Sequence, residues 1–198
     1  PQRQNLAACV WGAGKGRTLC AKMERRCTER GEASVKKRIL LGLISVFKAL
    51  YNAVYAVMKL RPMQKKVVMI SRQSNSQRPD FEQLGAEIEA RDPGVRLVYL
   101  CREMGDTPLE LLRYCFHLLH CAAELSTAHV CIIDGYCIPV SVLHHRKELR
   151  VVQVWHALGA IKKFGRQALS VPGGRDKELA ERMGMHKHYD AVLCASHR

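Results

Sequence analysis

The chain has 198 residues, of which 47% are hydrophobic and 25% charged, a balance typical of a globular domain with one core. Its formal net charge of +14 is uneven, because residues 1–66 hold 15 Lys and Arg against 3 Asp and Glu (+12), whereas the remainder holds 17 against 15 (+2). A nucleic-acid-binding domain more often spreads its positive charge over a folded face, so this distribution argues against that class.

The nine cysteines are not spaced like a disulfide framework. Most lie inside apolar runs, where cysteine behaves as a small hydrophobic residue. An odd number of cysteines in a chain without a cleavable signal peptide indicates a reducing compartment. Because the chain starts at Pro1 and stops at Arg198 just past a predicted strand, we expect it to be a fragment of a longer protein.

Residues 1–33 show no sustained periodicity and are rich in Arg, Lys, Gly and Cys. This composition predicts a basic, disordered tail. The run from Gly12 to Thr18 superficially resembles a phosphate-binding loop. It lacks the required spacing and no predicted strand precedes it, so we do not expect a nucleotide site there.

Residues 34–62 contain the most hydrophobic segment, a predicted helix over residues 39–60. Its length would suffice to cross a bilayer, but small and polar residues recur every three or four positions and form one stripe. The stripe consists of Gly42, Ser45, Lys48, Ala49, Asn52, Ala56 and Lys59. Basic residues lie on both sides: Lys36, Lys37 and Arg38 before it, and Arg61, Lys65 and Lys66 after it. The pattern favours an amphipathic helix on the surface of an anionic membrane, with packing on the chain's own domain as the alternative. A true span is disfavoured, because Lys48 and Asn52 would be buried near mid-bilayer.

Beyond Pro62 the pattern alternates strands with helices, which predicts a Rossmann-like parallel α/β sheet over residues 63–198. Removal of residues 1–62 should then leave a folded domain. The expected strands are residues 66–71, 95–101, 129–134, 150–155 and 191–195. The expected helices are residues 80–90, with Asp80 as N-cap, 108–125, 138–148 and 176–183. Asp134 ends the third strand, which suits either a ligand site at this edge of the sheet or an ordinary helix cap.

Residues 151–165, VVQVWHALGAIKKFG, join a β-branched strand to a loop with a histidine, glycines and paired lysines. These residue types at the carboxyl end of a strand suit chemistry on an anionic substrate, because ligands collect there in open α/β sheets. The alternative is a core strand followed by a packed Trp-His pair and a solvated basic turn.

The block resembles the Trp-His-Gly-Thr-Pro-Leu-Lys-Lys-like signature of the CDP-glycerol glycerophosphotransferase family, the teichoic-acid primases and polymerases. The matching residues are Trp155, His156, Lys162, Lys163 and Gly165. Ala157, Leu158 and Gly159 depart from the commonest form, which leaves the transferred polyol open. A Ser/Asn-containing loop follows the first strand in the family too, so Ser71 and Asn75 are expected near the site.

The resemblance implies an enzyme with two Rossmann-like domains, the arrangement known as GT-B, of which this chain covers the N-terminal acceptor domain. His156 would be the base for the acceptor hydroxyl. Lys162 and Lys163, with Gly159, Asp134 and Ser71, would bind the acceptor or its phosphates. The donor, CDP-glycerol or CDP-ribitol, would bind to the second domain, so this chain alone should be inactive. The acceptor would be a polyprenyl-linked polyol phosphate at the cytoplasmic face of the cell membrane, and no cofactor or nucleic acid is implied.

Two other functions remain open: a GT-B glycosyltransferase that uses a sugar nucleotide, and a non-catalytic membrane-associated module. Histidines also occur in pairs, His117 with His120, His144 with His145, and His186 with His188. None of these pairs lies beside a matched Cys-x2-Cys or carboxylate motif, so no metal site is expected.

Overall fold

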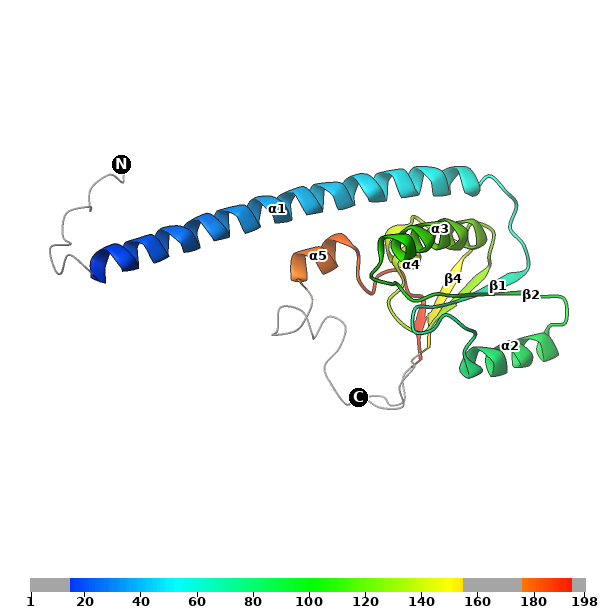
Figure 1. Cartoon of the computed structure of the whole chain (residues 1–198). Coiled ribbons are helices and arrows are strands. Elements are labelled where there is room, and N and C mark those ends of the chain that lie inside the picture. The colour runs from blue at the N-terminus through cyan, green and yellow to red at the C-terminus, as the bar shows by residue number, and fades with distance from the viewer. Residues whose placement is uncertain (1–14, 155–175, 194–198) are drawn as a thin grey trace. The chain divides into compact units, whose positions relative to one another are not determined.

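A computed structural model describes residues 15–154 and 176–193, with side chains from residue 35 onward. The chain divides into two compact units, Pro1–Leu43 and Ile44–Arg198. The described part of the first unit is the amino-terminal portion of helix α1, and the second unit contains the end of that helix and the whole sheet (Figure 1).

Five strands form one parallel sheet, which confirms the predicted Rossmann-like α/β class. They are β1 (Lys66–Ser71), β2 (Arg96–Cys101), β3 (Val130–Ile133), β4 (Arg150–Gln153) and β5 (Ala191–Val192). Their order across the sheet is β2-β1-β3-β4-β5, and every neighbouring pair is parallel. The chain therefore moves outward from β1 to β2, crosses back over β1, and continues in the other direction from β3.

The helices lie close to the expected positions, with two differences, at the start of α1 and at the end of α4. They are α1 (Lys15–Met58), α2 (Pro79–Arg91), α3 (Pro108–Leu125), α4 (Ile138–Val142) and α5 (Lys177–Arg182). Helix α4 was expected to continue to residue 148 but ends at Val142. Asn52 of α1 explains the early end, because its side-chain amide donates to the Val142 carbonyl and its Oδ1 accepts from the His144 amide.

Alternate side chains of β1 supply the two faces of the core. Val68 and Ile70 face a large cluster that contains the buried residues of α3, α4 and the end of α1. Val67 and Met69 face a smaller cluster with Phe81 of α2. This alternation is the period of two that a strand buried on both faces requires.

Helix α1 begins at Lys15, inside the segment that composition marked as a disordered tail. No proline interrupts the sequence between Lys15 and Met58, and Lys, Arg, Ala, Met and Leu are frequent in it. These residues favour a helix intrinsically, so a helix can form here without a sustained apolar periodicity.

The last turns of α1 belong to the core of the second unit. Tyr51 and Tyr55 are buried, and the Tyr51 hydroxyl donates to the Leu118 carbonyl of α3 over 2.5 Å. Polar members of the stripe face the same way: the Lys48 ammonium donates to the Arg182 carbonyl and the Lys59 ammonium to that of His144. The division expected at residue 62 stays a prediction, but a cut there would remove two buried tyrosines.

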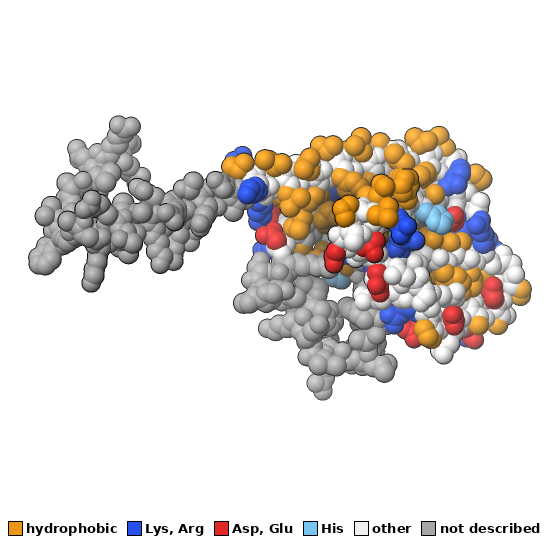
Figure 2. All heavy atoms as spheres, in the orientation of Figure 1, with side chains coloured by type: hydrophobic (Ala, Val, Ile, Leu, Met, Phe, Trp, Pro, Cys, Tyr) orange, Lys and Arg blue, Asp and Glu red, His pale blue; other side chains and the backbone are white. Residues whose placement is uncertain are grey.

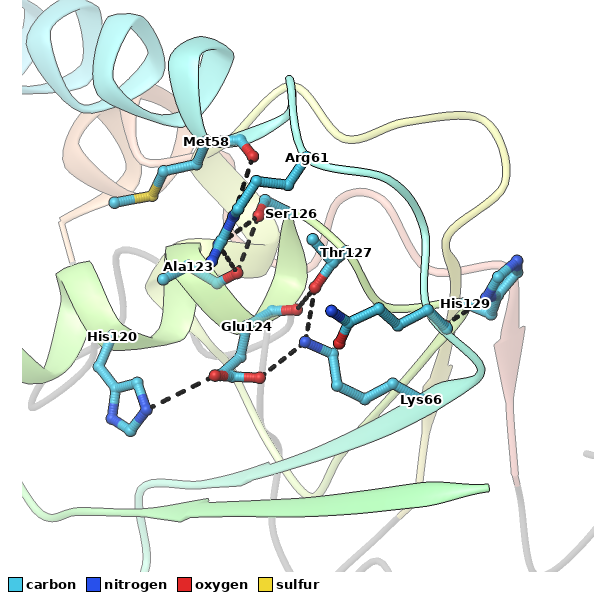
Figure 3. A network of polar contacts seen from close by, with 10 residues as sticks. Met58, Arg61, Lys66, His120, Ala123, Glu124, Ser126, Thr127 and His129 are labelled. Carbon is cyan, nitrogen blue, oxygen red and sulfur yellow. Dashed lines mark hydrogen bonds and ion pairs between the residues drawn. The ribbon is translucent and has the colours of Figure 1, made fainter. Parts of the chain in front are cut away.

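Two cations expected to flank a membrane helix are bound by the domain itself (Figure 3). The Lys66 ammonium is buried and lies 2.7 Å from the Glu124 carboxylate and 2.6 Å from the Thr127 hydroxyl. The Arg61 guanidinium donates to the Ala123 carbonyl and to the Ser126 hydroxyl. These two groups therefore stabilise the junction of α1, β1 and α3, and Lys66 is not accessible to lipid headgroups.

Candidate functional site

The strand order reverses between β1 and β3, and their carboxyl ends define the candidate site. In an open α/β sheet the connections from such a pair leave toward opposite faces, and the crevice between them is where ligands bind. The register pairs Ile70 with Ile133, so the next residues, Ser71 and Asp134, emerge side by side. The structure thus brings together two of the residues that the sequence proposed.

Ser71 and Asp134 are directly bonded. The Ser71 hydroxyl, fully buried, donates to Asp134 Oδ2 over 2.6 Å and accepts from the backbone amide of Gln73 over 3.1 Å. Asp134 was also considered as a helix cap, but Cys137 occupies the N-cap position of α4. The carboxyl is instead held at the edge of the sheet by the end of β1.

Two arginines from the loop after β1 lie around this pair. Arg78 Nη1 is 3.7 Å from Asp134 Oδ2, and Arg78 Nη2 is 2.9 Å from the Asp80 carboxylate. The Arg72 guanidinium lies over the Tyr136 ring and donates to the Tyr136 carbonyl. Arg78, not Asp80 as expected, is the N-cap residue of α2, and Asp80 lies in the first helical turn.

Asn75, which was expected near the site, connects two loops at the edge of the sheet. Its Oδ1 accepts from the backbone amide of Glu103 over 3.0 Å, which ties the loop after β1 to the loop after β2. The Ser71 carbonyl accepts from the amide of Arg102 and strengthens the same connection. Asn75 therefore holds the two loops together beside the candidate site, and a contact with ligand stays a prediction.

Gln153 is a polar residue at this edge that the sequence analysis did not select. It ends β4, pairs with Ile133 in the register and is 2% exposed, and its Nε2 has no hydrogen-bond partner among the described residues. A buried amide without a partner is rare in folded proteins. Its signal in the sequence is a single polar residue within the apolar strand VVQV.

The residues of the Trp-His block lie outside the described residues. Trp155, His156, Gly159, Lys162, Lys163 and Gly165 all belong to residues 155–175. Their assignment stays a prediction. The structure gives only the point from which that segment departs, the carboxyl end of β4, next to β3 in the sheet.

Several histidine side chains in the described part of the chain are hydrogen-bonded within the protein: His117, His129, His145 and His186. No group of three or more His, Cys, Asp or Glu there could hold a metal ion. His145 is enclosed between Tyr55, whose hydroxyl lies 2.9 Å from Nδ1, and the Val140 carbonyl, 3.1 Å from Nε2. Burial lowers the pKa of His145 to about 4, so the ring is neutral at physiological pH.

The arrangement can bind a hydroxylated, anionic ligand. The Asp134 carboxylate offers acceptor oxygens to hydroxyl groups, and the Arg72 and Arg78 side chains supply positive charge beside it. What the described edge lacks is a group that could take a proton near neutral pH. A base for hydroxyl activation would have to come from elsewhere, and the segment that follows β4 contains a histidine.

The fold and this edge define an open parallel α/β domain of the ligand-binding kind, with its site at the strand-order reversal. Residues 53–198 match the family model described as CDP-Glycerol:Poly(glycerophosphate) glycerophosphotransferase. The chain belongs to that family, as its Trp-His block suggested.

Curated relatives agree with this assignment. The chain is 29% identical over 155 residues to the teichoic acid ribitol-phosphate primase of Bacillus spizizenii, covering 78% of this chain and 40% of the relative. It is 25% identical over 149 residues to the teichoic acid poly(ribitol-phosphate) polymerase of the same species, covering 75% and 23%. It is 30% identical over 80 residues to the teichoic acid glycerol-phosphate primase of Bacillus subtilis, covering 40% and 21%. The chain thus spans two fifths or less of the length of these relatives.

Proposed function

We propose that the protein transfers an alditol phosphate, glycerol phosphate or ribitol phosphate, from a CDP-alditol to a polyol-phosphate acceptor in the synthesis of a teichoic-acid-like polymer. The observation that carries the proposal is the polar edge at the strand reversal, Ser71 and Asp134 with two arginines, which lies next to the strand that leads into the Trp-His block. Membership of the family supplies the reaction type.

In this proposal the chain is the acceptor half of a GT-B enzyme. His156 takes the proton of the attacking acceptor hydroxyl, for which an imidazole with a pKa near neutrality is suited. Attack on the β-phosphorus of the donor forms the new phosphodiester bond, and CMP leaves with the electrons of the broken P–O bond. Lys162 and Lys163 neutralise phosphate oxygens, while Asp134 and Ser71 orient the polyol. The donor binds to the part of the protein beyond this chain.

The acceptor is membrane-linked in this proposal, and the protein works at the cytoplasmic face of the membrane as a peripheral protein. Support comes from the basic amino-terminal segment and from the apolar helix α1, whose stretch Val35–Met58 contains an 18-residue window with a mean hydropathy of 1.6. By length and composition this stretch could also cross a bilayer. The polar contacts of Lys48, Asn52 and Lys59 with the domain favour the peripheral arrangement.

The test requires the protein extended to the length of its relatives. CMP release should be followed with CDP-glycerol, CDP-ribitol and a sugar nucleotide as donors. His156→Ala should lower kcat by about 10²–10⁴-fold and leave donor affinity unchanged, because the base acts only on the acceptor. His120→Ala is the matched control, since His120 is an exposed histidine of α3.

Each outcome has a clear meaning. Turnover of the sugar nucleotide alone would identify a glycosyltransferase and contradict the proposal. Absence of turnover with every donor, in a protein that binds vesicles, would indicate the non-catalytic module. A His156→Ala variant that folds normally and keeps more than about a tenth of its kcat would reject His156 as the base.

A further inference from the structure

Helix α1 has an unusual outward face within the second unit. Between Ile44 and Met58 every exposed position is apolar. These positions are Val46, Phe47, Ala49, Leu50, Ala53, Val54, Ala56 and Val57. The polar residues of the same turns, Lys48 and Asn52, point to the domain instead. A helix on the surface of a soluble protein normally has the opposite arrangement, with its charged and polar side chains toward water.

Helix α3 presents a second apolar stripe. Leu109, Leu112, Phe116 and Leu119 follow one another at helical spacing and are between 40% and 64% exposed. The opposite side of α3 is filled by the core residues Tyr114, Leu118, Cys121, Ala122 and Leu125. The stripe is therefore additional to what the fold needs for its own core.

The two stripes belong to one surface. The Tyr51 hydroxyl of α1 bonds to the Leu118 carbonyl of α3, so the helices pack against each other over the same face of the sheet. Figure 2 shows hydrophobic side chains gathered along both helices on the visible face. We call this surface the apolar platform and define it by Phe47, Leu50, Val54 and Val57 of α1 and Leu109, Leu112, Phe116 and Leu119 of α3.

We propose that the apolar platform inserts into one leaflet of an anionic membrane, with α3 as a second lipid-contacting helix beside α1. Contiguous exposed apolar surface of this kind marks a docking site. Lipid is the occupant that the charge pattern favours. Residues 15–38, directly before the platform in sequence, contain nine Lys and Arg against three Glu, and such a basic segment is attracted to anionic lipid headgroups. This inference rests on the membrane location in the proposed function and adds the surface that makes the contact.

The contacts of α1 exclude a crossing orientation for its last turns. Tyr51 and Tyr55 are buried in the core, and Lys48, Asn52 and Lys59 are hydrogen-bonded to the domain. A bilayer-spanning helix would have to abandon these contacts and place Lys48 and Asn52 in hydrocarbon. Insertion of the outward stripes alone preserves all of these contacts. The domain would then contact the membrane through two helices, α1 and α3.

Sedimentation with vesicles of phosphatidylglycerol and phosphatidylcholine tests the platform. The double variant Leu112→Gln/Phe116→Gln changes only exposed side chains of α3 and leaves all basic residues in place. Its partition coefficient should fall by at least about tenfold, because each substitution removes a large apolar side chain from the lipid contact. The matched control Met104→Gln/Leu193→Gln replaces two exposed apolar residues outside the platform and should stay within about twofold of the parent.

Several results would overturn the inference. The α3 variant could bind vesicles as well as the parent while retaining the parent's thermal midpoint. Gel filtration could show that the parent is a dimer and the variant a monomer, with the same vesicle partition coefficient for both. That result would assign the surface to contact with a second copy of the chain. In the full-length protein, finally, the variant could have no effect on partition, which would mean that the remainder of the protein covers α3.

The proposed function can be tested separately. CMP release with a short soluble acceptor should be unchanged in Leu112→Gln/Phe116→Gln, because the platform is separate from the carboxyl edge of β1 and β3. Loss of vesicle binding with no transferase activity in the parent would support the platform and reject the proposed function. Transferase activity in the parent, together with unaltered vesicle binding in the variant, would support the proposed function and reject the platform.

Discussion

Lys65 and Lys66 are adjacent in sequence, but the same substitution should destabilise the protein much more at Lys66 than at Lys65. The Lys66 side chain is 2% exposed and bonds to Glu124, which is 18% exposed (Figure 3). Lys65 and its partner Asp92 are 62% and 44% exposed. Burial tends to raise the pKa of Glu124, but the hydrogen bond and charge of Lys66 outweigh burial and lower it. The ion pair therefore holds Glu124 in its charged form inside the structure.

Lys66→Met should lower the free energy of unfolding substantially. Loss of one partner from a buried ion pair costs about 3–5 kcal/mol because the other charge stays buried alone. Since Glu124 retains some exposure to water, we expect about 2–3 kcal/mol, or a thermal midpoint about 5–10 °C lower. Lys65→Met should cost at most about 1 kcal/mol, because exposed ion pairs contribute little.

Urea unfolding of the 198-residue chain, followed by circular dichroism, measures both variants. The variant Lys66→Met/Glu124→Gln should recover part of the loss, with a coupling energy above about 1 kcal/mol, because the unpaired charge is then removed as well. Equal midpoints for Lys65→Met and Lys66→Met would refute the reasoning from burial.

Three further predictions follow from the contacts. Deletion of residues 1–43 should preserve cooperative unfolding, whereas deletion of residues 1–62 should abolish it or cost several kcal/mol, because Tyr51 and Tyr55 leave the core. Between about pH 6.5 and pH 4 the free energy of unfolding should fall as pH falls, because His145 binds a proton in the unfolded chain but stays neutral in the folded protein, where its pKa is about 4. His145→Gln should make the free energy of unfolding less dependent on pH in this range. Ser71→Ala should cost about 1.5–3 kcal/mol in unfolding assays, against at most about 0.5 kcal/mol for the exposed control Ser76→Ala, because only Ser71 bonds a buried carboxyl.

The positions of the strands could be predicted from the sequence because local composition decides them. Runs such as KVVMIS and VRLVYLC are rich in β-branched and apolar residues, and helix-length segments separate them. The capping box of α3, formed by Thr107 and Glu110, is also encoded locally. The family could be recognised from the Trp-His block for the same reason, since a motif is a property of consecutive residues.

The composition of the candidate site could be predicted only in part. Ser71 and Asp134 end predicted strands, but their direct bond depends on β1 and β3 being neighbours, which the chain order does not state. Arg78 and Gln153 were missed because each looks ordinary in sequence: one precedes a helix, and the other interrupts an apolar strand. Only the register of the sheet brings them to the same edge.

The apolar composition of residues 39–60 by itself predicted a helix, and α1 runs through this segment as far as Met58. Only the tertiary structure decided that Lys48 and Asn52 face the domain, where they satisfy carbonyl groups at the ends of α5 and α4, while Ala49 and Ala56 of the same stripe are exposed. It likewise decided that Lys66 is buried and Lys65 is not. The physical reason is that a sequence fixes the spacing of side chains along an element, whereas burial depends on which carbonyls and carboxylates other elements bring within hydrogen-bonding distance.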